Sequence, residues 1–157
     1  MNDIQINAEG AGDWVMKRAG GFFTPGYDQS ITRHYSSGTI RGGFVLNAYT
    51  GACFAVHNAG IDPRWCSRDL LWMVFHYAFE QIKCHKLVAP INSTNHKAMD
   101  MALRAGWELE AVIRDATPVG HLMLLTMTRD KCPWLRLIPQ SYLPGEVARH
   151  TQEPADG

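Results

Sequence analysis

The sequence predicts a single α/β (α+β) domain with a mixed central sheet of about six strands and helices on both faces. The main observation is an order of strand, loop, helix, strand and helix between residues 52 and 104. A helix between two strands is the connection that a parallel pair needs. The second observation is a set of apolar and aromatic runs bounded by turn residues, which predicts antiparallel strands. These runs are 30–34, 39–49, 107–115 and 121–128.

The N-terminal part is expected to begin loosely, because residues 1–12 show no clear periodicity. Residues 13–18 have the spacing of a short amphipathic helix, which a following Gly-Gly pair ends. The strand over 39–49 contains Gly42 and Gly43, where we expect a kink or a bulge.

The central part begins with a strand over 52–57 and a loop over 58–68 that is rich in Gly, Asp, Pro and Arg. A helix is predicted over 68–83, with Ser67 as the residue whose hydroxyl caps it. Apolar side chains recur along this helix at spacings of three and four, which predicts one buried face. That face includes Leu71, Phe75 and Phe79.

A second short strand, 86–91, and a second helix, 95–104, follow. Asn95 is expected to cap this helix, and Gly106 to end it in the left-handed conformation that glycine favours. The side chains expected to face the core are Met99, Ala102 and Leu103.

Length and charge limit the possible classes of protein. The 157 residues suit one domain, predicted over 1–135, with a proline-containing C-terminal tail over 136–157. The formal net charge of +0 gives no strong nucleic-acid signal. No run approaches the ~18 apolar residues of a membrane span, and no N-terminal signal peptide is visible. We therefore expect a cytoplasmic protein.

The four cysteines predict neither a disulfide framework nor a metal site. They are not arranged as Cys-x-x-Cys, and reduced thiols are usual inside cells. The cysteines are Cys53, Cys66, Cys84 and Cys132.

Several short motifs, in this order and spacing, resemble the GNAT superfamily of acyl-CoA N-acyltransferases. The most similar branch acetylates ribosomal-protein N-termini and includes small phage and prophage members. In that branch an Asn opens the second helix and a Gly-aromatic pair follows eleven positions later, as here. The motifs are Tyr77-Ala78-Phe79, Leu87-Val88-Ala89, Asn95 and Gly106-Trp107, within a resemblance that covers roughly residues 40–135.

The resemblance implies that acetyl-CoA, as co-substrate, lies between strands 52–57 and 86–91. Its pantetheine arm would pair with free backbone groups near Val56 and Asn58, and Asn95 would touch this arm or hold the loop. The acceptor would be an amine of a protein or a small molecule. The remaining residues expected to bind the cofactor lie in the loop before the helix, and they are Arg64, Trp65, Cys66, Ser67 and Arg68.

The chain departs from the family pattern in this loop. GNAT members usually carry Arg/Gln-x-x-Gly-x-Gly/Ala there, whose backbone N–H groups hold the pyrophosphate. Neither possible alignment places a glycine at the glycine positions of this motif. Helix N-terminal amides still favour phosphate, and Arg64 and Arg68 could supply charge.

His57 and Asn92 are the candidates for the catalytic site. His57 is expected at the end of its strand and has an unperturbed pKa near neutrality, so it could accept a proton. Cys66 lies between arginines that would lower its thiol pKa, which makes it an alternative nucleophile. Many GNAT members carry a Tyr that protonates the leaving thiolate, but this chain has Ala102. Water or another group would then supply that proton.

Two other functional classes remain open at this stage. The first is an inactive GNAT fold that serves as a binding or structural protein, possibly in a phage virion, with its tail docked on a protein partner. In that case the location would be the host cytoplasm or the virion. The second is an acyltransferase that modifies nucleic acid, against which the balanced charge argues.

Overall fold

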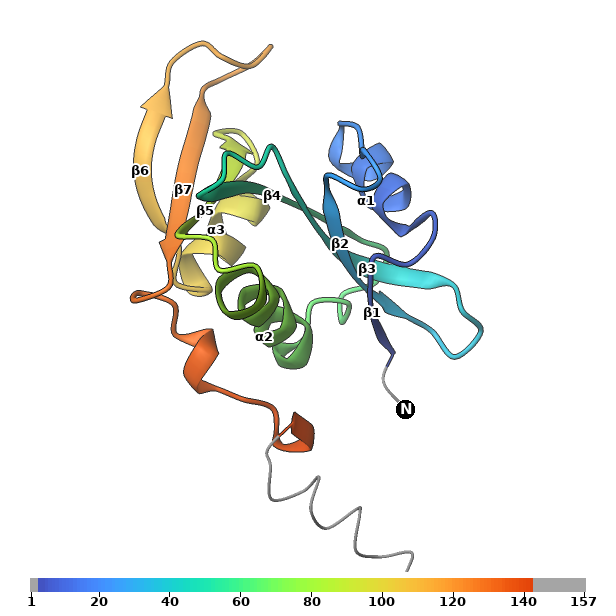
Figure 1. Cartoon of the computed structure of the whole chain (residues 1–157). Helices are drawn as coiled ribbons and strands as arrows, with labels where there is room; N and C mark the ends of the chain where they lie inside the picture. The colour runs from blue at the N-terminus through green and yellow to red at the C-terminus, as the bar shows by residue number, and fades with distance from the viewer. Residues whose placement is uncertain (1–2, 143–157) are drawn as a thin grey trace, which may run out of the picture.

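A seven-stranded mixed sheet runs through the computed structural model of the chain, which describes residues 3–142 (Figure 1). The strand order is β1-β2-β3-β4-β5-β7-β6. The predicted mixed sheet is confirmed, with one strand more than the approximate count. The strands are β1 (Ile4–Ile6), β2 (Gln29–His34), β3 (Ile40–Asn47), β4 (Cys53–Gly60), β5 (Lys86–Asn92), β6 (Glu108–Ile113) and β7 (Leu122–Thr128).

The additional strand is β1, in the segment that we expected to be a loose start. It pairs antiparallel with β2 over three residues. A strand of three residues is too short to show a period of two in the sequence, so only its partner reveals it.

The parallel pair predicted from the sequence is confirmed. β4 and β5 pair in parallel from Cys53–Lys86 to Ala55–Val88, and the pairing ends there. β4 was expected to end at His57, but it continues to Gly60 because Asn58–Gly60 still pair with β3. The two strands therefore separate while each stays bonded to its outer neighbour.

Helices cover both faces of the sheet, as predicted. On one face, α1 (Ala11–Ala19) packs Val15 and Met16 against Val45 of β3. On the other face lie α2 (Arg68–His76), its continuation as a π-helix η1 (Tyr77–Gln81), and α3 (His96–Arg104). The helix predicted over 68–83 is thus one helical segment whose last turn is wider than an α-helix.

The predicted core face of this helical segment is confirmed for Phe75 of α2 and Phe79 of η1, which are buried. Leu71 is only half-buried because it lines a cavity between α2 and the sheet. On α3, Ala102 is buried and Met99 packs against the core. The prediction that Leu103 also faces the core is wrong, because 51% of its surface is exposed.

The ends of the helices follow the predicted chemistry at two of three positions. The Asn95 side-chain oxygen accepts the Ala98 N–H at 3.1 Å, and Gly106 adopts φ +97° after α3. Ser67 does occupy the N-cap position of α2, but its hydroxyl caps no backbone N–H. That hydroxyl is bonded instead to Arg33 and Asp69.

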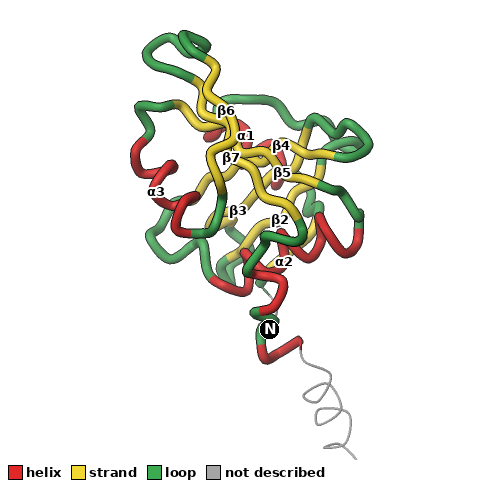
Figure 2. The backbone as a smooth tube through the Cα atoms, turned by 90° about the vertical axis from the view of Figure 1, so that its left-hand side faces the viewer, coloured by secondary structure: helices red, strands yellow, loops and turns green. Residues whose placement is uncertain are grey.

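The β6–β7 hairpin extends beyond the rest of the molecule in both views (Figures 1 and 2). All six residues of β6 are exposed. β7 lies between β5 and β6, so the last strand in the chain is inserted into the sheet and the preceding one becomes the edge.

The chain after β7, which includes the start of the predicted tail, packs on α2 and at the end of α3. It contains two short 3₁₀ turns, η2 (Trp134–Arg136) and η3 (Gln140–Tyr142). The Trp134 indole N–H donates to Ala105 O at 2.8 Å, and the Tyr142 ring stacks on Trp72 at 5.1 Å. The rest of the tail, 143–157, and any partner docked on it lie outside the described residues. Within the described part, no helix is long and apolar enough to span a membrane.

Candidate functional site

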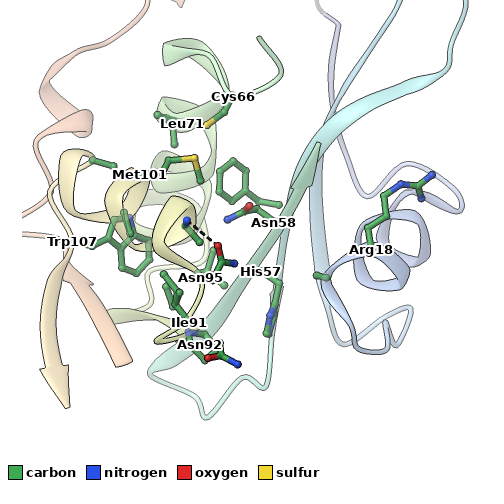
Figure 3. Close-up of a pocket in the computed structure, with 18 residues that line it drawn as sticks. Arg18, His57, Asn58, Cys66, Leu71, Ile91, Asn92, Asn95, Met101 and Trp107 are labelled. Carbon is green, nitrogen blue, oxygen red and sulfur yellow. Dashed lines mark hydrogen bonds between the residues drawn. The ribbon is translucent and has the colours of Figure 1, made fainter. Parts of the chain in front are cut away.

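A cavity of about 360 Å³ opens where β4 and β5 separate (Figure 3). All three helices contribute to its walls. Predicted site residues that line it include Val56, His57, Asn58, Cys66, Asn92 and Asn95. The structure thus brings together candidates from the first strand, the loop, the second strand and the second helix. The other predicted residues of the loop do not line this cavity, and they are Arg64, Trp65, Ser67 and Arg68.

The inner edge of β4 presents free backbone groups to this cavity. The Ile61 N–H donates to Arg41 O across the β3–β4 pair, so alternate residues of β4 point their backbone groups toward β3. The N–H and C=O groups of Val56 and Asn58 therefore point toward β5, beyond the last β4–β5 pair. An extended ligand with amide groups could bond to this edge as an added strand.

His57 lies on the face of the sheet that α1 covers. Figure 3 shows His57 and Arg18 on one side of β4, with Asn58 and Met101 on the other. Burial lowers the pKa of His57 below its ordinary 6.5, and the negative charge of Asp28 partly opposes that shift. The imidazole is therefore neutral near pH 7 and can accept a proton.

Asn92 and Asn95 each use their side-chain oxygen inside the protein. Asn92 Oδ1 accepts from the N–H and the hydroxyl of Thr94, both at 3.0 Å, which fixes the turn after β5. Asn95 Oδ1 caps α3 (Figure 3). Both residues line the cavity, so their amide N–H₂ groups are the parts that can donate to a ligand.

The loop between β4 and α2 is anchored at Asp62. The carboxylate accepts from Arg41 Nε at 2.6 Å, the Tyr35 hydroxyl at 2.5 Å and the Arg64 N–H at 2.7 Å. Hydrogen bonds from Arg41 and Tyr35 lower the pKa of Asp62 from 3.8 to about 2. Arg41 lies between the β2–β3 pairs His34–Ile40 and Arg33–Gly42, so the shift in register predicted near Gly42 is present.

This anchor gives a first prediction. Asp62→Asn should accelerate amide hydrogen exchange in residues 61–67 without unfolding the domain, because the amide cannot hold the guanidinium as a carboxylate does. Asp130→Asn, an exposed change far from the loop, should leave that exchange unaltered. In the wild type the anchor should persist above pH 3.8 and be lost as pH falls through about 2, since the folded pKa is depressed. Equal exchange rates in both variants would contradict this role.

The N-terminal end of α2 is already occupied by polar and charged side chains of the protein. Ser67, one of the predicted cofactor ligands, is bonded to Arg33 and Asp69. Asp69 Oδ1 accepts the Leu70 N–H at 3.0 Å, and Asp69 Oδ2 lies 2.7 Å from Arg33 Nη2. Burial alone would raise the pKa of Asp69, but the bonds from Ser67 and Arg33 outweigh it and lower that pKa. A carboxylate thus occupies part of the positive helix end that would attract a phosphate.

Trp65 packs on the sheet instead of extending from the loop. Its ring lies so close to Gly42 and Gly60 that a Cβ at either glycine would fall within 2.8 Å of it. The ring also contacts Phe44, at 5.3 Å between centroids. Gly42 and Gly60 are partners in the β3–β4 pair, so the lack of side chains at both positions makes room for the indole.

Burial of Cys66 argues against the hypothesis that its thiol is a nucleophile. Burial raises the pKa of the Cys66 thiol to about 11, and the nearby charge of Arg33 does not compensate. The thiolate is therefore scarce at neutral pH, and a direct transfer to an amine does not need it.

A second groove continues from the cavity toward the loop. Its lining includes basic side chains that no sequence motif indicated. Lys97 and Arg104 of α3 line it, and Met101 of the same helix face lines both spaces. Arg64 and Arg68 are exposed at the loop and the start of α2. Spacings of four and seven residues could have indicated that Lys97, Met101 and Arg104 share a face, but not what that face borders. Among residues 3–142, no group of His, Cys, Asp and Glu is arranged to hold a metal ion.

Comparison with known proteins gives a structural match and no sequence match. No protein-family model matches the chain, and no curated protein sequence does. Among solved structures, a point mutant of the spermidine N-acetyltransferase SpeG from Vibrio cholerae has a TM-score of 0.60 and 14% identity, over 72% of this chain and 71% of that one. A chimera of that enzyme with hSSAT has a TM-score of 0.65 and 10% identity, over 83% and 98%. The chain has the GNAT fold.

A dodecameric form of the same Vibrio cholerae enzyme matches this GNAT fold with a TM-score of 0.61 and 12% identity, over 68% of each chain. These neighbours act on a small-molecule amine according to their names. They do not support the ribosomal-protein or phage branch that the sequence motifs resembled.

Proposed function

We propose that the chain is an acetyl-CoA-dependent N-acetyltransferase with a small-molecule amine as acceptor. The observation that carries the proposal is the separation of parallel strands β4 and β5 after Ala55–Val88, with a cavity in the gap. That opening exposes the β4 edge at Val56 and Asn58, which suits the amide-containing pantetheine arm. The N-acetyltransferases named above share the fold.

The residues present fit acetyl-CoA at two places. The β4 edge offers backbone donors and acceptors for the arm, and Lys97 and Arg104 line the groove as cations for the phosphates. Arg64 and Arg68 are exposed on the neighbouring loop and at the start of α2. Trp65 and Ser67, which we also expected to bind the cofactor, are used within the protein.

Acetyl-CoA would supply an activated acetyl group. The amine nitrogen forms a bond to the acetyl carbon as the carbon–sulfur bond breaks, so the amine must lose a proton. His57 is placed to take that proton because it is neutral and lines the cavity. The Asn92 amide group can orient the acceptor. Ala102 also lines the cavity and supplies no proton, so the released thiolate takes its proton from water or from another group.

The loop cations give a prediction about cofactor affinity. The double variant Arg64→Ala/Arg68→Ala should weaken CoA binding about 2- to 30-fold in calorimetry, because exposed ion pairs contribute about 0.2–1 kcal/mol each. The control Lys17→Ala/Arg114→Ala removes the same charge from exposed sites outside the groove and should bind normally. Unchanged affinity in the first variant would remove the loop from the site.

Two observations favour a second candidate function, namely a GNAT fold that binds a ligand without transferring a group. Asp69 and Ser67 close the start of α2, where a pyrophosphate would be expected, and Ala102 stands where many members have a tyrosine. Such a protein would have no use for a proton acceptor at His57.

The deciding experiment combines binding and turnover. Acetyl-CoA at a hundred times its dissociation constant should stabilise the protein by about 2.7 kcal/mol in a thermal unfolding assay. Release of free CoA thiol in the presence of amines should then report transfer. Binding without thiol release across amino acids, amino-acid amides and polyamines would support the second candidate. The absence of binding would refute the proposed acetyltransferase.

A further inference from the structure

We propose that the acceptor amine carries an apolar body, which packs on a part of the sheet beside the cavity that α1 does not reach. The inference rests on the proposed acetyl transfer and specifies its acceptor. We call this surface the apolar shelf. It lies on the α1 side of β5, β7 and β6, and its residues are Val88, Pro90, Ala111, Ile113, Leu122 and Leu124.

The pairing of the strands places these side chains on one face. Paired residues of neighbouring strands point to the same side of a sheet, and successive residues of one strand point to opposite sides. Val45 packs against α1 and pairs with His57, so His57 is on the α1 side. Ala55 is therefore on this side as well, and it pairs with Val88 of β5. The same side continues onto β7 and β6 through the pairs Pro90–Leu124, Leu124–Ala111 and Leu122–Ile113.

This face of the sheet is apolar, yet it contributes to no core. On the opposite face, Leu125 of β7 is buried in the core beneath α2 and α3. On the α1 side, the helix packs on β2, β3 and β4 (Figure 1). Within the described part of the chain, Val88, Leu122 and Leu124 pack in neither core cluster, and Ile113 is 47% exposed. An apolar surface of this kind is typical of a binding site.

The shelf is continuous with the cavity, which passes through the sheet. Pro90 belongs to the shelf and also lines the cavity. His57 lies across the gap from Pro90, since each follows the last β4–β5 pair by two residues. Met101 and Trp107 line the cavity from the α3 side (Figure 3). The pantetheine arm can therefore occupy the gap and its α3 side, while the acceptor presents its amine to His57 from the shelf.

The charges around the shelf favour an acceptor with a single amine. Among the described residues, no Asp or Glu lines the cavity or belongs to the shelf. Lys86, which precedes the shelf on β5, is already paired with Glu110 at 2.6 Å. A second ammonium group on the acceptor would lose water without gaining a carboxylate, whereas a hydrocarbon chain would gain by covering the shelf. In this respect the chain would differ from its spermidine-acetylating structural neighbours.

The test extends the acceptors of the thiol-release assay to amines that differ in chain length or in the far end of the chain. These are ethylamine, butylamine, hexylamine and hexamethylenediamine, with spermidine for comparison. We expect kcat/KM to rise about 2- to 4-fold for each methylene group added, because burial of a methylene group contributes up to about 0.8 kcal/mol. Hexamethylenediamine should be about 10-fold poorer than hexylamine or worse, and spermidine should also be poor.

Variants of Leu124 test the shelf itself. Leu124→Asp places a carboxylate beside Pro90 and should reverse the preference between hexylamine and hexamethylenediamine. Leu124→Ala is milder and should raise KM for hexylamine about 3- to 10-fold with kcat nearly unchanged, since it removes binding common to ground and transition states. Its KM for ethylamine should stay the same. The matched control is Val112→Asp, because Val112 is 45% exposed on the same hairpin but pairs with Met123 on the opposite face.

Four results would overturn the inference. Two concern acceptors: diamine or spermidine acetylation as efficient as that of hexylamine, and acetyl-CoA binding with no acetylation of any alkylamine. The third is the same acceptor preference in Leu124→Asp and Val112→Asp. The fourth is a dimer, measured by light scattering, that only Leu124→Asp dissociates, because the shelf would then bind a second copy of the chain. Failure of the proposed function is a distinct result, since the protein would then not bind acetyl-CoA in calorimetry.

Discussion

His57→Ala should lower kcat at saturating acetyl-CoA by about 10²–10⁴, the usual contribution of a positioned general base. His57 lines the cavity on the α1 side, next to the separation of β4 and β5, and is neutral because burial lowers its pKa. Acetyl-CoA affinity in calorimetry should barely change, since the β4 backbone makes the contacts to the arm. His85→Ala is the control, because His85 is exposed and outside the cavity.

The pH dependence gives an independent readout of the same residue. The rate should rise with pH as the imidazole loses its proton, with a midpoint below the ordinary value of 6.5. The His57→Ala variant should lose this step. Asp28→Asn should move the wild-type midpoint to lower pH, because the Asp28 charge raises the pKa of His57. Near-normal turnover in His57→Ala would rule out this histidine and indicate water as the proton acceptor.

Phe75→Ala should lower the free energy of unfolding by about 3–5 kcal/mol, the range measured for removing a buried phenylalanine ring. Phe75 is 1% exposed, and its ring centroid lies 6.3 Å from that of Phe79 and 6.0 Å from that of Trp107. The cavity left by the ring could collapse only partly, because its neighbours belong to the π-helical turn and to the segment before β6. Urea unfolding would measure the change.

The control for this prediction lies on α3. Leu103→Ala removes a large apolar side chain that is 51% exposed, so its effect should stay within about 0.5 kcal/mol. If Phe75→Ala cost less than about 1 kcal/mol, the ring could not be part of the main core, and the assignment of this helix face would be wrong.

Local chemistry was sufficient to predict the order of the elements. The three- and four-residue spacing along α2 and η1 identified Phe75 and Phe79 as core residues, because a helix turns once in 3.6 residues. Asn95 and Gly106 marked the ends of α3 because their side-chain and backbone preferences act within a few residues. The length of the helical connection alone indicated that β4 and β5 are parallel.

Features that depend on partners distant in the chain were not predictable in the same way. β1 forms because it pairs with β2. β4 extends beyond His57 because Asn58–Gly60 pair with β3. The Ser67 hydroxyl bonds to Arg33, which comes from a strand 34 residues earlier. Cys66 has two flanking arginines in the sequence, yet burial controls its pKa.

The sequence by itself determined which residues form most of the helices and strands, which helical faces are apolar, and that a parallel strand pair lies within residues 52–91. Periodicity and capping are local, so they are present in the chain before it folds. Only the tertiary structure decided where the strands separate, that His57 and Arg18 share one side of a cavity, and that Lys97 and Arg104 border the groove beyond it. Those relations depend on which strands pair and which face each helix covers, and distances between remote segments are set by packing.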